Sequence, residues 1–107
     1  MKIKERLDGK SLTLFLDGDF DDTSCFAVEQ KFDEAIVREV EDISFNMKHV
    51  QYISSFGIRV LILAHKKAVK LGKKVALSEM SNKVRGIIEM VGILSIFCGQ
   101  GAMKDAS

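Results

Sequence analysis

The stretch that decides the fold runs from residue 42 to residue 80: "DISFNMKHVQYISSFGIRVLILAHKKAVKLGKKVALSEM". It opens with a strand pattern, in which every second residue is apolar: Ile43, Phe45 and Met47. A strongly apolar helical run follows two adjacent serines and stops at Gly72, because glycine commonly ends helices. The last eight residues, 73–80, predict a short strand. Strand, helix and strand in this order predict a right-handed crossover between parallel strands.

The amino-terminal half of the chain predicts a hairpin and a helix before this unit. "KIKERL" (2–7) and "SLTLFLDG" (11–18) predict two strands joined across Asp8-Gly9, a dipeptide typical of tight turns. "TSCFAVEQKFDEAIVREV" (23–40) predicts a helix that Thr23 or Ser24 can cap. Its apolar residues are expected near one buried face: Phe26, Val28, Phe32, Ala35 and Ile36.

The carboxyl-terminal part predicts one more helix and one more strand. "SNKVRGIIEMVG" (81–92) has Ser81 as its cap and Gly92 at its exit. "ILSIFCG" (93–99) predicts the last strand. The whole chain, 1–107, is therefore expected to form one α/β domain with a mixed, mostly parallel sheet of about five strands. Residues 100–107 are expected to form a loose tail.

Composition excludes several classes of protein. Sixteen basic and 15 acidic residues give a net charge of +1, so no overall positive field favours nucleic acid. The amino-terminal residues lack the apolar core of a secretory signal. The longest apolar run, "VLILA" (60–64), is too short to cross a bilayer. These features predict a cytoplasmic protein that does not insert into a membrane.

The helix after the two serines has two distinct sides. Five apolar residues are expected to face the sheet: Ile58, Leu61, Ile62, Ala68 and Val69. His65 falls at the edge of this face and is expected to be a hydrogen-bonded core histidine. The opposite side is basic, with Arg59, Lys66, Lys67 and Lys70, yet Val60 and Leu63 stand among these cations. Either the two aliphatic residues form a contact surface for another protein, or they pack against the neighbouring helix.

The two serines allow two interpretations. A helix begins with unpaired backbone N–H groups, and a serine side chain can accept a hydrogen bond from one of them. The same N–H groups and the helix dipole stabilise an anion, so a serine hydroxyl here is also well placed to carry a phosphate. Gly57 permits close backbone packing beside the serines.

Three segments resemble the STAS domain family, particularly the bacterial anti-sigma factor antagonists. These are "LFLDGDFDDTS" (14–24), "VQYISSFGIRVLI" (50–62) and "SNKVRGIIEMVGILSIF" (81–97). They follow one another along the chain in the order in which that family has its motifs. The resemblance implies a STAS-like fold with helices mainly on one face of the sheet. Phe56 departs from the family pattern, where a small residue is usual, and Ser54 stands where aspartate is common.

The resemblance implies a non-catalytic function in partner switching. An antagonist of this kind binds an anti-sigma factor that is also a serine kinase, and phosphorylation by this kinase separates the two proteins. A metal-dependent serine phosphatase then resets the cycle. The phosphoacceptor position falls on Ser55, with Ser54 as the weaker candidate. The implied partner surface comprises Asp19, Asp21, Ser54, Ser55, Phe56, Gly57, Arg59, Val60 and Leu63.

Other functions have less support in the sequence. Asp17, Asp19 and Asp21 alternate as in a calcium-binding loop, but Asp22 and Val28 occupy the positions where that loop needs glycine and glutamate. No nucleophile elbow or phosphate-binding loop is present, so no enzyme activity, metal or cofactor is expected. Two alternatives within the resemblance remain: a STAS subunit of a membrane-lipid ABC transport complex, and a nucleotide-sensing STAS module.

Overall fold

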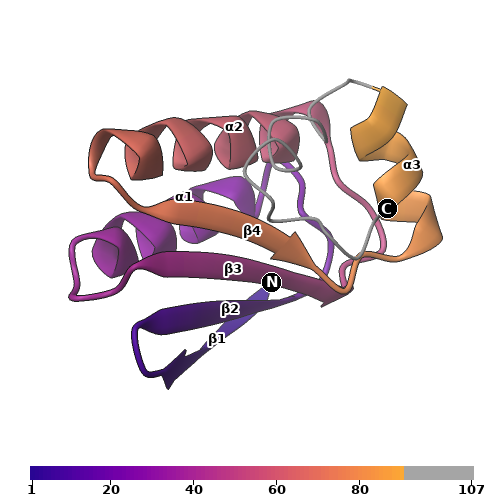
Figure 1. Ribbon diagram of the computed structural model, residues 1–107. Coiled ribbons are helices and arrows are strands. Elements are labelled where there is room, and N and C mark those ends of the chain that lie inside the picture. The colour runs from indigo at the N-terminus through magenta and orange to yellow at the C-terminus, as the bar shows by residue number, and fades with distance from the viewer. Residues whose placement is uncertain (91–107) are drawn as a thin grey trace.

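The computed structural model describes residues 1–90, which form one sheet and three helices (Figure 1). The hairpin consists of β1 (Lys2–Asp8) and β2 (Ser11–Asp17). The remaining elements follow as α1 (Cys25–Ile36), β3 (Asp42–His49), α2 (Ser55–Lys70), β4 (Lys74–Ser78) and α3 (Asn82–Met90). The predicted element order is confirmed up to this point. The predicted strand 93–99, the exit of the last helix at Gly92 and the tail 100–107 lie outside the described residues.

The sheet is mixed and mostly parallel, as predicted, with strand order β1-β2-β3-β4. β1 runs antiparallel to β2, whereas β2, β3 and β4 are parallel. The hairpin turn differs from the prediction by one residue. Asp8 pairs with Ser11, so the turn residues are Gly9 and Lys10, and Gly9 adopts a φ of 64° that suits glycine.

The core lies between one face of the sheet and the helices α1 and α2, which cover that face together (Figure 1). Alternate residues of the three parallel strands are at most 1% exposed: Leu12, Leu14, Leu16, Ile43, Phe45, Met47, Val75 and Leu77. The ring of Phe32 in α1 stacks on that of Phe45 in β3, with centroids 5.7 Å apart. Each such buried side chain contributes about 1.5–3 kcal/mol, so this shared face holds the layers together.

The predicted helix faces need three corrections. Phe26 is 70% exposed and Val69 is 55% exposed, so neither belongs to the core. Val60 is only 7% exposed, so the expectation that it lies on an open contact surface is wrong. Because α2 contacts α1 as well as β4, its buried side is turned away from Val69 and toward Val60, so Val60 follows the second interpretation, packing inside the domain.

Gly72 ends α2, as predicted, with a φ of 69°. The N–H of Lys73 donates to the carbonyl of Ala68 at 2.8 Å, and that of Gly72 donates to the carbonyl of Val69 at 3.1 Å. These two bonds form a Schellman motif, which satisfies carbonyls that the helix end would otherwise leave unpaired.

The edge strand β1 is held to α1 by Glu5. Its carboxylate lies 2.9 Å from the Nζ atom of Lys31 and also pairs with Arg38. Hydrogen bonds from Arg38 and then Lys31 hold the pKa of the Glu5 carboxyl below its ordinary value. These ion pairs connect β1, whose residues are largely exposed to solvent, to the body of the domain.

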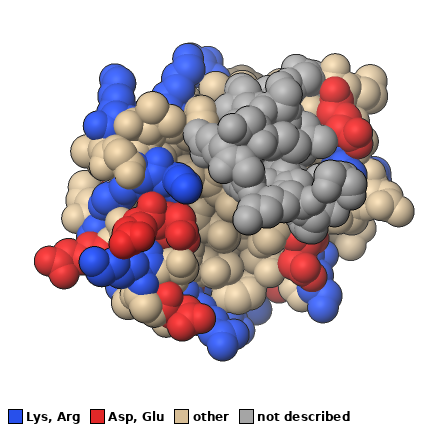
Figure 2. Space-filling view, in the orientation of Figure 1, with Lys and Arg blue, Asp and Glu red and all other residues tan. Residues whose placement is uncertain are grey.

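The surface carries both signs of charge. Figure 2 shows basic and acidic side chains side by side on the visible face, with uncharged residues between the groups. This mixture matches the near-neutral composition and gives that face no broad field of one sign. None of the helices in residues 1–90 has the length and apolar character needed to cross a bilayer.

Candidate functional site: the amino end of α2

Two loops meet at the carboxyl edge of the parallel strands and form the base of the site. The loop after β2 and the segment before α2 are joined by backbone hydrogen bonds. The N–H of Phe20 donates to the carbonyl of Tyr52, and the N–H of Ser54 donates to that of Phe20, both at 2.9 Å. These bonds continue the parallel pairing beyond the two strands and fix the point at which α2 begins.

Ser54 is the N-cap of α2 and is not a free surface hydroxyl. Its backbone is extended, with φ −88° and ψ 173°, and its side-chain oxygen accepts a hydrogen bond from the N–H of Gly57 at 3.2 Å. Only 9% of the residue is exposed. Of the two interpretations of the serines, helix cap or phosphate-carrying hydroxyl, the helix cap therefore applies to Ser54.

Gly57 is buried because the first turn of α2 lies directly against the loop after β2. A Cβ atom at this position would lie 2.7 Å from the carbonyl oxygen of Phe20 and 2.9 Å from a side-chain carbon of Ile53. No real side chain tolerates such contacts without movement of the surroundings. Gly57 therefore positions the helix start and offers no side chain of its own to a partner.

Ser55 is the first residue of α2 and is exposed. Its hydroxyl forms no hydrogen bond within residues 1–90, and the backbone N–H groups of Ser55 and Phe56 have no acceptor there either. Two backbone donors at the positive end of a 16-residue helix thus lie beside an accessible hydroxyl. This arrangement can accommodate an anionic group on Ser55.

The loop after β2 supplies the acidic residues of the site. The Asp21 carboxylate accepts hydrogen bonds from the N–H and the hydroxyl of Thr23, at 3.1 and 2.8 Å. The Thr23 hydroxyl is the main reason why the pKa of Asp21 is lowered. Asp19 is exposed, and its backbone carbonyl accepts a hydrogen bond from the Ser24 hydroxyl at 2.7 Å. Asp21 is therefore partly used to build the start of α1, whereas the Asp19 carboxylate faces solvent.

The remaining predicted surface residues differ in exposure. Phe56 is 52% exposed and Arg59 is exposed, so both can be reached by a partner. Leu63 is half-buried, and Val60 belongs to the core. The exposed part of the predicted surface thus consists of Asp19, Ser55, Phe56 and Arg59, with Asp21 and Leu63 at its margins.

One feature of this site was not predicted from the sequence, and the predicted capping of α1 by a Thr23 or Ser24 side chain needs a correction. Tyr52 is 44% exposed two residues before the cap, and it adds an aromatic ring at the same edge of the sheet. Ser24 occupies the N-cap position of α1, yet its side chain makes no cap hydrogen bond and bonds the preceding loop instead. The position of Tyr52 in the sequence, two residues before a predicted helix cap, could have indicated that its ring lies at this site.

A STAS domain family model matches residues 1–106. The chain belongs to the STAS domain family. Among curated proteins, this STAS domain is similar to an anti-sigma F factor antagonist from Paenibacillus polymyxa. The two are 28% identical over 86 residues, which cover 79% of this chain and 74% of that protein.

Solved STAS structures share the fold at lower sequence identity. An anti-sigma factor antagonist from Mycobacterium paratuberculosis aligns with a TM-score of 0.78 and 16% identity, covering 90% of this chain and 81% of that one. SpoIIAA, an anti-sigma factor antagonist, aligns in its unphosphorylated form with a TM-score of 0.76 and 17% identity, covering 86% and 82%. Its phosphorylated form aligns with a TM-score of 0.69 and 16% identity, covering 86% and 85%.

Proposed function

We propose that this STAS domain is a non-catalytic partner-switching regulator, an anti-sigma factor antagonist whose binding is turned off by phosphorylation of Ser55. The observation that carries the proposal is that the two serines differ in burial and in hydrogen bonding. Ser54 is buried and caps the helix, whereas Ser55 is exposed with its hydroxyl free of hydrogen bonds within residues 1–90. The similarity to an anti-sigma F factor antagonist supports the class of partner.

The proposed partner is an anti-sigma factor that also acts as a serine kinase. It would contact the surface around Ser55, using Phe56 as an apolar anchor and Arg59 and Asp19 as charged contacts. A metal-dependent serine phosphatase would remove the phosphate and restore binding. Neither step requires a catalytic residue in this chain.

Phosphorylation at this position weakens binding for an electrostatic reason. A phosphate adds about −1.5 to −2 charges to the centre of the contact surface, where a partner would have to desolvate it. The free protein tolerates the same group, because the N–H groups of Ser55 and Phe56 and the helix dipole stabilise it. The modification therefore changes the affinity for the partner while leaving the fold intact.

The proposal is tested by incubating the protein with a cognate anti-sigma factor kinase and ATP, followed by mass spectrometry of the intact chain and its peptides. We expect one phosphate on wild type and Ser54→Ala, and none on Ser55→Ala. Ser81→Ala, which removes the equivalent cap of α3, serves as the matched control and should be labelled like wild type. Labelling of Ser55→Ala at the wild-type level would eliminate Ser55 as the acceptor.

A further inference from the structure

The stretch from β3 to β4 carries charge of one sign only. Residues 43–78 contain seven lysine and arginine residues and no aspartate or glutamate, although the whole chain has a net charge of +1. Six of these cations lie on α2 or within four residues of its end: Arg59, Lys66, Lys67, Lys70, Lys73 and Lys74. Figure 2 shows basic side chains at the upper left of the molecule, where Figure 1 places the carboxyl-terminal half of α2. Positive charge is therefore concentrated around one helix.

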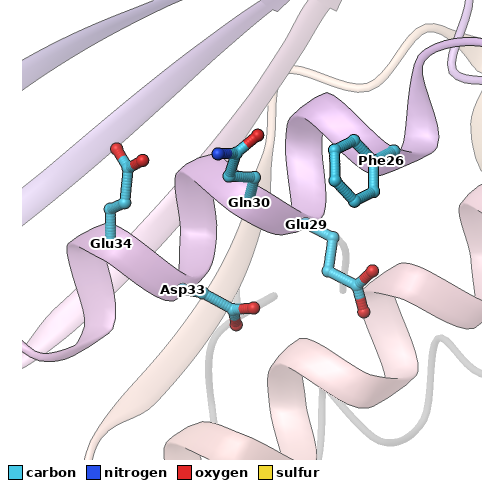
Figure 3. A pocket seen from close by; sticks show the side chains of 5 residues that line it. All are labelled: Phe26, Glu29, Gln30, Asp33 and Glu34. Carbon is cyan, nitrogen blue, oxygen red and sulfur yellow. The ribbon is translucent and has the colours of Figure 1, made fainter.

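Two of these lysines are used inside the domain. The Nζ atom of Lys67 lies 2.7 Å from an oxygen of Asp33 and 3.9 Å from one of Glu29. Figure 3 shows both acidic side chains directed from α1 toward α2. The Nζ atom of Lys73 donates a hydrogen bond to the carbonyl oxygen of Ile36 at 2.6 Å, at the end of α1. These two lysines connect α2 to α1, so their burial of charge has a structural explanation.

The other side of α2 carries cations without such partners. Lys66 and Lys70 are exposed, and neither forms an ion pair with any residue from 1 to 90. Val69 lies on the same side of the helix, because residues three and four apart are neighbours there, and it is 55% exposed. Leu71, at the end of the helix, is 53% exposed. We call Lys66, Val69, Lys70 and Leu71 the α2 patch.

The stability of the domain does not account for the α2 patch. Lys70 in the last turn complements the helix dipole, but Lys66 lies more than a turn from the helix end, where this effect has faded. A single exposed aliphatic residue is ordinary on a protein surface. Here two large aliphatic side chains, each more than half exposed, stand next to two cations that no acidic residue of 1–90 offsets. This combination indicates a contact with something both anionic and apolar.

We propose that the α2 patch binds the surface of a membrane that contains anionic lipids, with no segment crossing the bilayer. A basic helix with exposed aliphatic residues is typical of such peripheral contacts. The two lysines attract the headgroups, and Val69 and Leu71 enter the boundary between headgroups and acyl chains. Each lysine close to an anionic membrane surface strengthens binding about fivefold, so the contact is weak and reversible.

Other anionic occupants fit the α2 patch less well. Lysine is a compact point charge that suits a fluid array of headgroups, whereas arginine is favoured where a carboxylate or phosphate is held in paired hydrogen bonds. Single-stranded nucleic acid stacks its bases on aromatic rings, and the α2 patch has none. An acidic protein segment offers nothing to exposed Val69 and Leu71 unless it also carries a matching apolar surface.

The α2 patch lies apart from the proposed phosphorylation site. Lys66 comes 11 residues after Ser55 in α2, which corresponds to about 16 Å along the helix axis. That separation exceeds the distance of about 8 Å over which salt screens charges under physiological conditions. The inference therefore goes beyond the proposed function and does not depend on it.

The test measures cosedimentation of the full chain with sucrose-loaded vesicles. One set contains phosphatidylcholine alone, and the other contains phosphatidylcholine and phosphatidylglycerol in equal parts. We expect the chain to partition onto the vesicles with phosphatidylglycerol and not onto the others. Binding should be lost at roughly 0.5 M salt, where surface electrostatics are screened.

Charge variants show whether the position of the lysines matters. Lys66→Gln and Lys70→Gln should each weaken partitioning by about fivefold, and the double variant by about 25-fold. Lys2→Gln with Lys4→Gln removes the same charge from β1, on the face of the sheet that the helices do not cover. This matched control should partition like wild type.

Apolar variants separate a membrane from other anions. Val69→Ser with Leu71→Ser leaves the charge unchanged and should still weaken partitioning. The chain contains no tryptophan, so a single one reports only on its own surroundings. On vesicles with phosphatidylglycerol, the emission of Leu71→Trp should shift to shorter wavelength, whereas that of Leu7→Trp in β1 should not. Ser55→Ala should partition like wild type.

Three results would overturn the inference. The first is equal partitioning onto the two kinds of vesicle. The second is an equal loss in the Lys2/Lys4 and Lys66/Lys70 double variants, because then only the total charge matters. The third is unchanged partitioning of Val69→Ser with Leu71→Ser, which would assign the lysines to an acidic protein or to nucleic acid. Because Ser55 plays no part in this assay, any of these results would leave the phosphorylation proposal standing.

Discussion

Replacement of Gly57 by alanine is the most direct test of how the site is built. In an ordinary helix this change stabilises by about 1 kcal/mol, because alanine has the higher helix propensity. At Gly57 the added Cβ would lie 2.7 Å from the carbonyl oxygen of Phe20 and 2.9 Å from its Cδ1 atom. The oxygen is a backbone atom of a fully buried residue, so it cannot rotate away.

The two effects oppose each other, and the clash should win. Overpacking a tight site costs about 1–3 kcal/mol, and a backbone contact belongs at the upper end. Subtracting the propensity gain leaves a net loss of about 2 kcal/mol. For a domain of this size, that loss lowers the melting temperature by roughly 8–10 °C.

Gly86 provides the matched control. It also lies within a helix, α3, but an added Cβ there meets no atom within 4 Å. Gly86→Ala should therefore gain about 0.5–1 kcal/mol. Urea and thermal unfolding followed by circular dichroism measure both variants. If Gly57→Ala equals or exceeds wild type in stability, the helix start does not press against the loop as described, and the placement of Ser55 loses its physical basis.

Two further predictions concern the serine cap and the edge strand. Ser54→Ala should lower the free energy of unfolding in urea by about 1 kcal/mol, because the Gly57 N–H loses its acceptor, whereas Ser55→Ala should stay within about 0.5 kcal/mol of wild type. An equal loss in both variants would show that Ser55 also supports the helix. Glu5→Gln should be less stable than wild type at pH 7 by no more than about 1 kcal/mol, because its ion pairs are partly exposed. The folded pKa of Glu5 is lowered, so its contribution is present above the ordinary value of 4.5 and is lost as pH falls through the folded value. The difference between the two unfolding free energies should shrink as pH falls from the ordinary value of 4.5 through the lowered folded value, and a difference that does not narrow over this range would contradict the role assigned to Glu5.

The sequence by itself determined the elements and the mostly parallel sheet. In the three parallel strands every second residue is apolar and buried, and this period is set by contact with a single core face along each strand. The alternation of Leu12, Leu14 and Leu16 in β2 was therefore enough to predict which way these side chains point. Gly72 was equally predictable, because a helix end in the left-handed conformation strongly favours glycine.

Helical periodicity was less decisive, because the spacing of apolar residues did not show which side of α2 is buried: Val69 is exposed and Val60 is buried. α2 packs on both the sheet and α1, so Val60 is buried although it stands among cations in the helical wheel. Phe26 shows the opposite case. It is as apolar as Phe32 but lies on the side of α1 that no described element covers.

Only the tertiary structure decided which serine caps the helix and which is exposed. Two adjacent hydroxyls look equivalent in the sequence, and either can accept a bond from the helix start. The choice is made by Phe20, which comes from a loop 34 residues earlier in the sequence and accepts a hydrogen bond from the Ser54 N–H at 2.9 Å. That bond fixes Ser54 inside the first turn, Gly57 lets the loop approach, and Ser55 is left facing solvent. Such long-range contacts depend on how two loops meet at the edge of the sheet, which no local pattern encodes.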